Sequence, residues 1–314
     1  MKKLIASPLA FLLAACCFGQ TAAQTPAPAA KPSTPPVSVN LYGFVRNDMN
    51  YDSRQNVFVR EGQLDLYPKD LDTAGLAGAD ANKKSQLNIL GILTRFGIKV
   101  TGPDAFGAKT SAVIEGDFFG QADVNIGSLR LRHGYVKLDW EKHALTLGQT
   151  WYPLFVPECF PGVVNFNTGI PIAPFGWAGQ IKYTAKLSAA TSFSLTAYKP
   201  REFAVANVNP ADNANAPSMN ASIPELNAHF QYKTDAVLFG IQADYSSIMP
   251  YVKYGSNPVK VSTERVNAIT LMAYTKLTGK KVALKASAIM GQNTTHWVMM
   301  GGYYGYKASA TSIE

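Results

Sequence analysis

The sequence predicts an all-β protein, a transmembrane antiparallel β-barrel with about twelve strands in its 314 residues. Three observations predict this class. Apolar and polar side chains alternate along short runs, short turns alternate with long loops, and no apolar run after the N-terminus approaches the roughly 20 residues of a membrane helix. A secreted sandwich or propeller is the alternative, but such proteins do not alternate their loop lengths so regularly.

The alternation is most regular between residues 87 and 151, which read as strands over 87–100, 109–119, 129–140 and 144–151. Successive side chains of a strand point to opposite faces. Phe96 and Ile98 therefore oppose Arg95 and Lys99 in the first run. The second run sets Ala112, Ile114 and Phe118 against Ser111, Glu115 and Asp117, and the third sets Leu129, Leu131 and Tyr135 against Arg130 and Arg132, although Val136 and Leu138 break the pattern.

The charged side chains of these strands thus share one face. A buried unpaired charge loses several kcal/mol of hydration, so water must reach that face. An open sheet with one wet face would satisfy this condition, as would a closed barrel whose polar face lines a lumen. The other strands and loops have to decide between the two.

The N-terminus reads as a secretory signal peptide over residues 1–23, with Lys2 and Lys3 before an apolar run. A Pro/Ala-rich tether over 24–36 follows, and the barrel is assigned to 37–314. The segment before Cys16 also resembles a lipobox, which would make Cys16 a lipidated first residue. After cleavage near Ala23 only Cys159 remains, so no intrachain disulfide is expected.

The same alternation predicts further strands before and after residues 87–151. They are predicted over 37–50, 177–187, 191–199, 225–233, 236–247, 263–275 and 282–291, with a twelfth strand from 295 and a short one over 57–66. Long loops separate some of them, at 50–85, 152–176, 202–223 and 251–262. Segment 152–176 is irregular, rich in proline and apolar enough to fold inward, which makes it a candidate to line or narrow a pore.

Four motifs in order resemble the DcaP-like trimeric outer-membrane porins: TRFGIK at 94–99, EGDFFG at 115–120, LRLRHGYV at 129–136 and LGQTW at 147–151. The resemblance covers 90–152 well and the remainder only by pattern. It implies a sixteen-stranded barrel, a trimer and passive passage of small, often negatively charged solutes. Such porins end on a strand with a terminal aromatic residue, whereas this chain stops at Glu314. We therefore expect further C-terminal strands to be missing, with a smaller closed barrel as the alternative.

Strand parity assigns ten basic and five acidic residues to the lumen. The basic set is Arg46, Arg95, Lys99, Arg130, Arg132, Lys182, Lys186, Lys233, Arg265 and Lys285; the acidic set is Asp48, Glu115, Asp117, Glu225 and Asp244. This excess favours anions, because fixed positive charge lowers the energy of an entering carboxylate or phosphate. Two interpretations stay open: an ion-pair ladder that holds the wall, or a selective binding site.

We therefore predict an outer-membrane porin for passive diffusion of small hydrophilic solutes that favours anions such as carboxylates, without enzymatic activity, cofactor or metal. Its expected partners are outer-membrane lipid, the solutes and two further copies of the chain. Adhesion, a structural role or lipid hydrolysis are the alternatives; a lipase would use His133, which parity places on the lipid face without a matching Ser. The net charge of +8 also suits nucleic acid, but the leader and the inward basic residues argue against it.

Overall fold

The computed structural model describes residues 37–75, 77–162, 172–201, 203, 215–255 and 258–303. The predicted signal peptide, the tether and the lipidation site at Cys16 lie outside these residues, as do most of the predicted loop at 202–223 and the chain from 304 onward.

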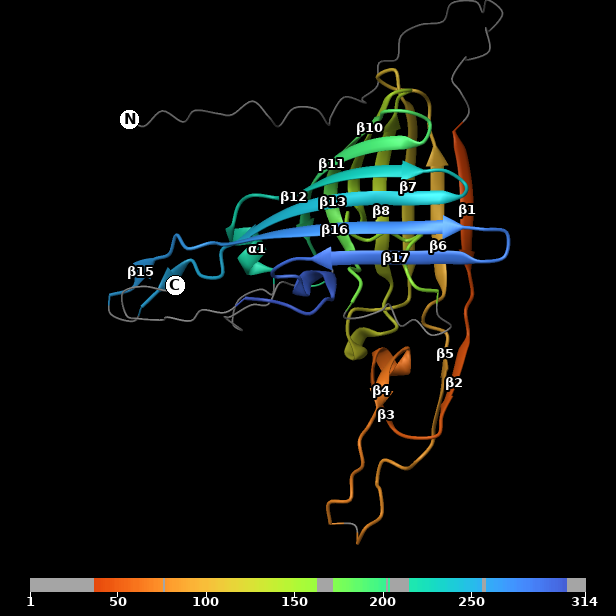
Figure 1. Ribbon diagram of the computed structural model, residues 1–314, viewed down its shortest axis with the longest axis vertical. Helices are drawn as coiled ribbons and strands as arrows, with labels where there is room; N and C mark the ends of the chain where they lie inside the picture. Colours follow the sequence, from red (N-terminus) through yellow and green to blue (C-terminus); the bar gives the residue numbers. More distant parts are fainter. Residues whose placement is uncertain are drawn as a thin grey trace, which may run out of the picture. The chain divides into compact units, whose positions relative to one another are not determined.

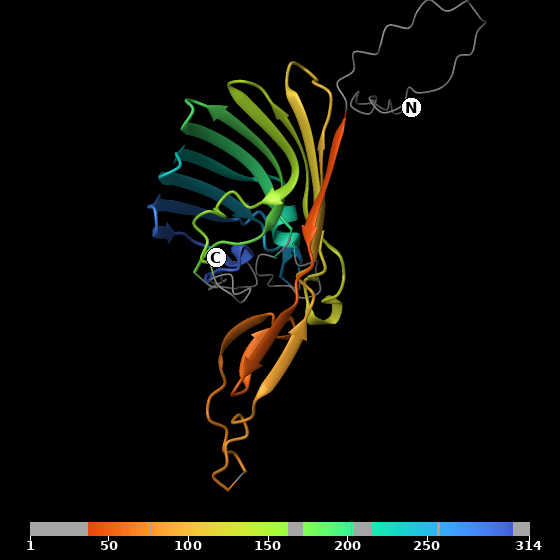
Figure 2. The same ribbon diagram turned by 90° about the vertical axis from the view of Figure 1, so that its right-hand side faces the viewer.

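The main element is one antiparallel sheet of eleven strands, which Figure 1 shows face on and Figure 2 shows curling. Its order follows the chain: β1 (Ser38–Phe44), β6 (Arg95–Thr101), β7 (Lys109–Asp117), β8 (Arg130–Asp139), β9 (His143–Trp151), β10 (Trp177–Lys186), β11 (Thr191–Pro200), β12 (Glu225–Lys233), β13 (Val237–Ile248), β16 (Val266–Thr278) and β17 (Ala283–Met290). The all-β, antiparallel prediction is confirmed.

Strand and loop lengths match those of a membrane-spanning sheet. Strands β7 to β13 have nine to twelve residues and β16 has thirteen, close to the 9–11 residues of a tilted membrane strand. Short turns at 140–142, 187–190, 234–236 and 279–282 lie at one end of the strands. The connections at 45–94, 152–176, 201–224 and 249–265 lie at the other end, which we call the long-loop end. The predicted alternation is therefore present.

The first long connection forms a ribbon of its own. The predicted strand over 37–50 is interrupted at 45–47, and the chain continues as β2 (Asp48–Asp52), which pairs with β5 (Gln86–Leu90). The predicted short strand at 57–66 becomes a hairpin of β3 (Asn56–Val59) and β4 (Leu64–Pro68), joined by η1 (Arg60–Gly62). A smaller hairpin of β14 (Lys253–Tyr254) and β15 (Lys260–Val261) occupies the loop after β13.

The two faces of the main sheet differ in chemistry. We call the face on which segment 152–160 packs the inner face, because that segment shares a core with Leu238 and Met272. The polar residues of β11 to β13 that share this face with Leu238 are buried as well. The opposite, outer face exposes large apolar side chains: Ile114, Ile181, Leu195, Leu226, Ile241, Ile269, Leu271 and Leu284. Such a broad exposed apolar surface is typical of contact with lipid or another protein.

One bulge changes the predicted parity of β8. Glu115 lies opposite His133, but the next residue of β7, Gly116, lies opposite Leu131, so Arg132 is the extra residue of a β-bulge. Alternation beyond the bulge is shifted by one position. His133 and Tyr135 consequently face inward, and the predictions that put Tyr135 opposite the arginines and His133 on the lipid face are wrong.

The described helices are short. They are η2 (Asp123–Asn125), α1 (Ala216–Asn220) and η3 (Thr295–Trp297), and none in the described ranges is long and apolar enough to cross a membrane. The strand predicted from 295 is wrong at its start, where the structure has the 3-10 helix η3. Its Trp297 is fully buried in the core on the inner face, where the backbone N–H of Phe175 donates to the carbonyl of Trp297.

Candidate functional site: the inner face of the sheet

Three arginines and two carboxylates form a buried ladder across β6, β7 and β8. Arg130 donates Nε and Nη2 to the two oxygens of Asp117, both at 3.0 Å. Arg132 donates Nε to Glu115 Oε1 at 2.7 Å and Nη1 to Asp117 Oδ2 at 3.3 Å. Arg95 completes the ladder, with ion pairs of 3.7 Å to Glu115 and 3.9 Å to Asp117. The carboxylates thus satisfy most of the arginine charge.

Aromatic rings cover the guanidinium groups of the ladder. The Cζ atom of Arg130 lies 4.7 Å from the ring centroid of Trp177, and that of Arg132 lies 4.6 Å from Trp177 and 5.0 Å from Trp151. Contacts of this kind are favourable cation–π interactions. Arg130 and Arg132 are only 7% and 3% exposed, so the ladder is part of the wall and offers little surface to a solute.

Two glycines of the inner face allow tyrosines to lie flat across neighbouring strands. A Cβ on Gly97 would lie 2.4 Å from the ring of Tyr42, which crosses it and donates a 3.0 Å hydrogen bond to Glu115 Oε2. A Cβ on Gly240 would likewise meet Tyr274, whose hydroxyl accepts from Gln231 Nε2 at 2.7 Å. The close approach therefore requires glycine at both positions.

The segment after β9 folds onto the inner face and is held there by two lysines. Lys233 on β12 forms a 2.9 Å ion pair with Glu158, and Lys285 on β17 donates a 2.8 Å hydrogen bond to the carbonyl of Phe160. Burial by itself would raise the pKa of the Glu158 carboxyl. The hydrogen bond from Lys233 and the charges of Lys233 and Lys276 outweigh burial and hold this pKa below its usual value. The segment that the sequence predicted to fold inward does so over 152–162, and we call these residues the inward segment.

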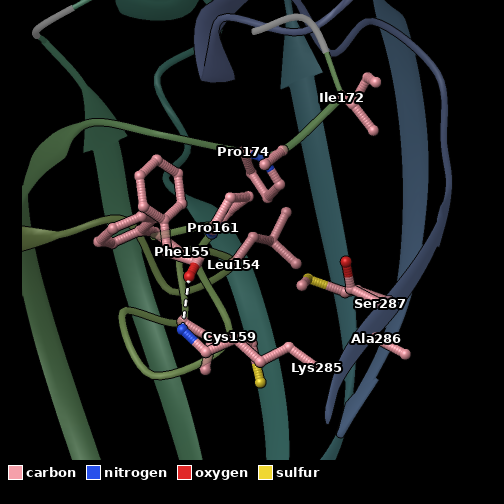
Figure 3. A pocket seen from close by; sticks show the side chains of 13 residues that line it. Leu154, Phe155, Cys159, Pro161, Ile172, Pro174, Lys285, Ala286 and Ser287 are labelled. Atoms are coloured by element: carbon pink, nitrogen blue, oxygen red, sulfur yellow. Dashed lines mark hydrogen bonds between the residues drawn. The ribbon is translucent and has the colours of Figure 1, made fainter. Parts of the chain in front are cut away.

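A mainly apolar cavity of about 320 Å³ separates this segment from β16 and β17. Figure 3 shows Leu154 and Phe155 on one side of it and Lys285 and Ser287 on the other, with Cys159 near Lys285. Burial and the charge of Glu158 raise the pKa of the Cys159 thiol. Cys159 is the only cysteine among the described residues, so it is a unique chemical handle in this segment.

A second cavity, of about 390 Å³, lies on the other side of the inward segment and is cationic. Lys137, Lys182 and Lys186 line it together with Gln180, His229 and Glu158, whose carboxylate pairs with Lys233. Lys137 and Lys186 both pair with Asp139, at 2.8 and 2.6 Å. Lys182 lines the cavity and makes no hydrogen bond or ion pair with any described residue. We call this space the lysine cavity.

Most of the predicted lumen residues lie on the inner face, in positions set by the strand register. The ladder contains Arg95, Arg130, Arg132, Glu115 and Asp117; the remaining strands place Lys99, Lys182, Lys186, Lys233, Lys285, Glu225 and Asp244 on the same face. The structure does not bring all of them together, because Glu225 and Asp244 form a separate buried group near the long-loop end.

Three predicted positions need correction. Arg46 lies between β1 and β2 and pairs with Asp48, which belongs to the ribbon, so neither lies in the main sheet. Arg265 precedes β16 at the parity of the exposed Ile269, and its Nη1 donates to the carbonyl of Ala221. The strand boundaries were predicted too long at these ends, which extended the alternation into loops.

Sequence reasoning missed two lysines of the inner face. Lys137 was hidden by the bulge at Arg132, which reverses the parity of the following residues. Lys276 lies opposite Lys285, one residue beyond the predicted end of its strand at 275. Continuing the alternation by one residue would have found Lys276, and the break in the pattern at Val136 and Leu138 was the sequence signal of the bulge.

A curled antiparallel sheet with membrane-length strands, an apolar outer face and a polar inner face defines the class of bacterial outer-membrane β-barrel proteins. The chain has a DcaP-like fold: it is similar to the outer-membrane channel DcaP of Acinetobacter baumannii, with a TM-score of 0.62 and 20% identity over 88% of this chain and 70% of that one. The outer-membrane protein OmpT of Vibrio cholerae matches with a TM-score of 0.42 and 10% identity, over 81% of this chain and 64% of that one. No family model and no curated protein sequence matches the chain.

Proposed function

We propose that this protein is a non-enzymatic channel of the bacterial outer membrane through which small hydrophilic solutes diffuse passively, with a preference for anions such as carboxylates. The observation that carries the proposal is Lys182 on the inner face, which has no hydrogen-bond or ion-pair partner among the described residues and lines the lysine cavity with Lys137 and Lys186. Of the ten basic residues that strand parity assigned to the lumen, Lys99 on the inner face of β6 is the second without a hydrogen-bond or ion-pair partner among the described residues. Fixed charges of this kind attract anions and repel cations.

The inward segment supports a diffusion pathway that is narrowed inside the sheet. Its Glu158 and Phe160 engage β12 and β17, so the segment crosses the inner face from β9. Placed there, it divides the inner space into the lysine cavity and the apolar cavity of Figure 3. A solute in the lysine cavity would meet the charge of Lys182 beside the constricting segment.

The proposed partners follow from the two faces. The apolar outer face suits outer-membrane lipid, and part of it suits neighbouring copies in the homotrimer that the family resemblance implies. Nucleic acid is not among the proposed partners, because Lys182 and the arginine ladder lie on the inner face. Lipid hydrolysis loses its candidate base, since His133 is buried on the inner face with its Nδ1 3.0 Å from Thr150 Oγ1.

A flux series tests the channel proposal. We expect proteoliposomes to swell faster in small dicarboxylates than in sugars or zwitterionic amino acids of similar size, because only the dicarboxylates gain from the unpaired lysines. Empty liposomes are the control. Equal rates for all three classes would contradict anion preference, and rates equal to those of empty liposomes would contradict a channel and favour an adhesive or structural role.

Chemical labelling of Cys159 tests the position of the inward segment. A negatively charged thiol reagent attached there adds bulk and anionic charge beside the proposed pathway. We therefore expect lower single-channel conductance and weaker anion preference in planar bilayers. Cys159→Ser protein treated with the same reagent is the matched control. Full labelling without a change in either quantity would show that the segment lies away from the pathway.

A further inference from the structure

A compact polar group lies on the inner face, apart from both the ladder and the lysine cavity. Thr196 on β11 lies opposite Asn227 on β12, and Asn227 lies opposite Asp244 on β13; in the next row Glu225 lies opposite Tyr198. Directly opposite residues on one face are close neighbours. Thr196, Glu225, Asn227 and Asp244 are each 3% exposed or less. This group, which we call the oxygen cluster, lies near the long-loop end.

Each carboxylate of the oxygen cluster uses only one of its two oxygens. Tyr198 Oη donates to Asp244 Oδ2 at 2.9 Å, and Asn227 Nδ2 donates to the same atom at 3.2 Å. The Nε2 atom of the fully buried His296 lies 3.1 Å from Glu225 Oε2. The second oxygen of each carboxylate is left for another partner.

Four buried oxygens of the cluster accept no hydrogen bond from the described residues: Asp244 Oδ1, Glu225 Oε1, Asn227 Oδ1 and Thr196 Oγ1. An unsatisfied buried acceptor costs about 1–3 kcal/mol, and more when it is charged. Two basic residues lie nearby, but Lys199 donates to the carbonyl of Ser218 and Arg265 to the carbonyl of Ala221. Within the described ranges no ion pair reaches Asp244. The cluster is therefore rich in acceptors, and no lysine or arginine among the described residues pairs with either of its carboxylates.

We propose that the oxygen cluster binds a hard cation of the calcium type. Such ions bind carboxylate, amide carbonyl and other oxygen atoms, which is the donor set that Asp244, Glu225, Asn227 and Thr196 offer. Zinc favours Cys and His ligands, and the single imidazole here already contacts Glu225. The cation would join β11, β12 and β13 where the loops at 201–224 and 249–265 begin. It is a site in the wall and does not rest on the proposed transport function.

Terbium luminescence tests the site, because Tb³⁺ replaces Ca²⁺ and is excited through nearby aromatic groups such as Tyr198. Protein refolded in detergent and stripped with a chelator should give one saturable signal that Ca²⁺ displaces and Na⁺ at equal ionic strength does not. Asp244→Asn should weaken Tb³⁺ binding about tenfold or more. Asp52→Asn, which changes a carboxylate of the ribbon, should bind as the unchanged protein does.

A second variant and tests of folding distinguish the loss of a cation site from the loss of the fold. Glu225→Gln serves as a second variant, and circular dichroism and heat-dependent gel mobility establish which variants are folded. Calcium should raise the thermal midpoint of unfolding of the unchanged protein and of Asp52→Asn. It should raise the midpoint of folded Asp244→Asn or Glu225→Gln by less. The absence of a saturable signal in the unchanged protein, or equal binding by a folded cluster variant, would overturn the proposal.

Discussion

Asp117→Asn should lower the free energy of unfolding by about 3–5 kcal/mol, since removing one partner of a buried ion pair leaves charge uncompensated. Asp117 is fully buried and pairs with Arg130, Arg132 and Arg95, so three guanidinium groups would share the single carboxylate of Glu115. The measurement is urea unfolding of the refolded protein in lipid vesicles, followed by tryptophan fluorescence.

The matched control is Lys109→Ala, which removes an exposed ion pair. Lys109 and Asp104 are 2.7 Å apart, but their side chains are 79% and 51% exposed, so the expected loss is below about 1 kcal/mol. Similar losses of unfolding free energy for both variants would contradict the proposal that the buried ladder stabilises the fold more than an exposed ion pair does. A large loss confined to Asp117→Asn would favour the ladder over the binding-site interpretation of these arginines.

Lys182→Glu should reverse or strongly reduce the proposed anion preference. A unit charge interacts with an ion roughly 4 Å away by about 1 kcal/mol in water. This substitution changes the charge of one side chain by two units, from positive to negative. We therefore expect the anion-to-cation permeability ratio to fall by about tenfold or more, as measured from the reversal potential of a planar bilayer under a salt gradient. Lys182→Gln, which changes one charge, should give an intermediate ratio.

Lys280→Glu is the control, because Lys280 is an exposed residue of the short turn between β16 and β17. An unchanged reversal potential in folded Lys182→Glu would contradict the proposed role of the lysine cavity. Reversing Arg130 would be a poor test of selectivity, because Arg130 is bonded to Asp117 in the ladder and its loss would destabilise the wall.

Much of the inner face could be predicted from alternation alone. Lys99, Lys182 and Asp244 follow the period of two in strands whose register is regular, so their parity was readable without a structure. Arg265 and Asp48 show where this reasoning ends. The sequence pattern can continue to alternate beyond the last hydrogen-bonded residue of a strand. The backbone of a loop or of a separate ribbon does not point its side chains according to that pattern.

The sequence by itself determined the fold class and the two faces of the sheet, because the direction of a strand side chain is a local property of the backbone. The tertiary structure alone decided what each charge does. The bulge at Arg132, the pairing of the arginines with Glu115 and Asp117, and the anchoring of Glu158 by Lys233 depend on register between strands and on contacts between residues far apart in the chain. Those contacts neutralise most of the predicted lumen cations and leave Lys182 and Lys99 unpaired among the described residues.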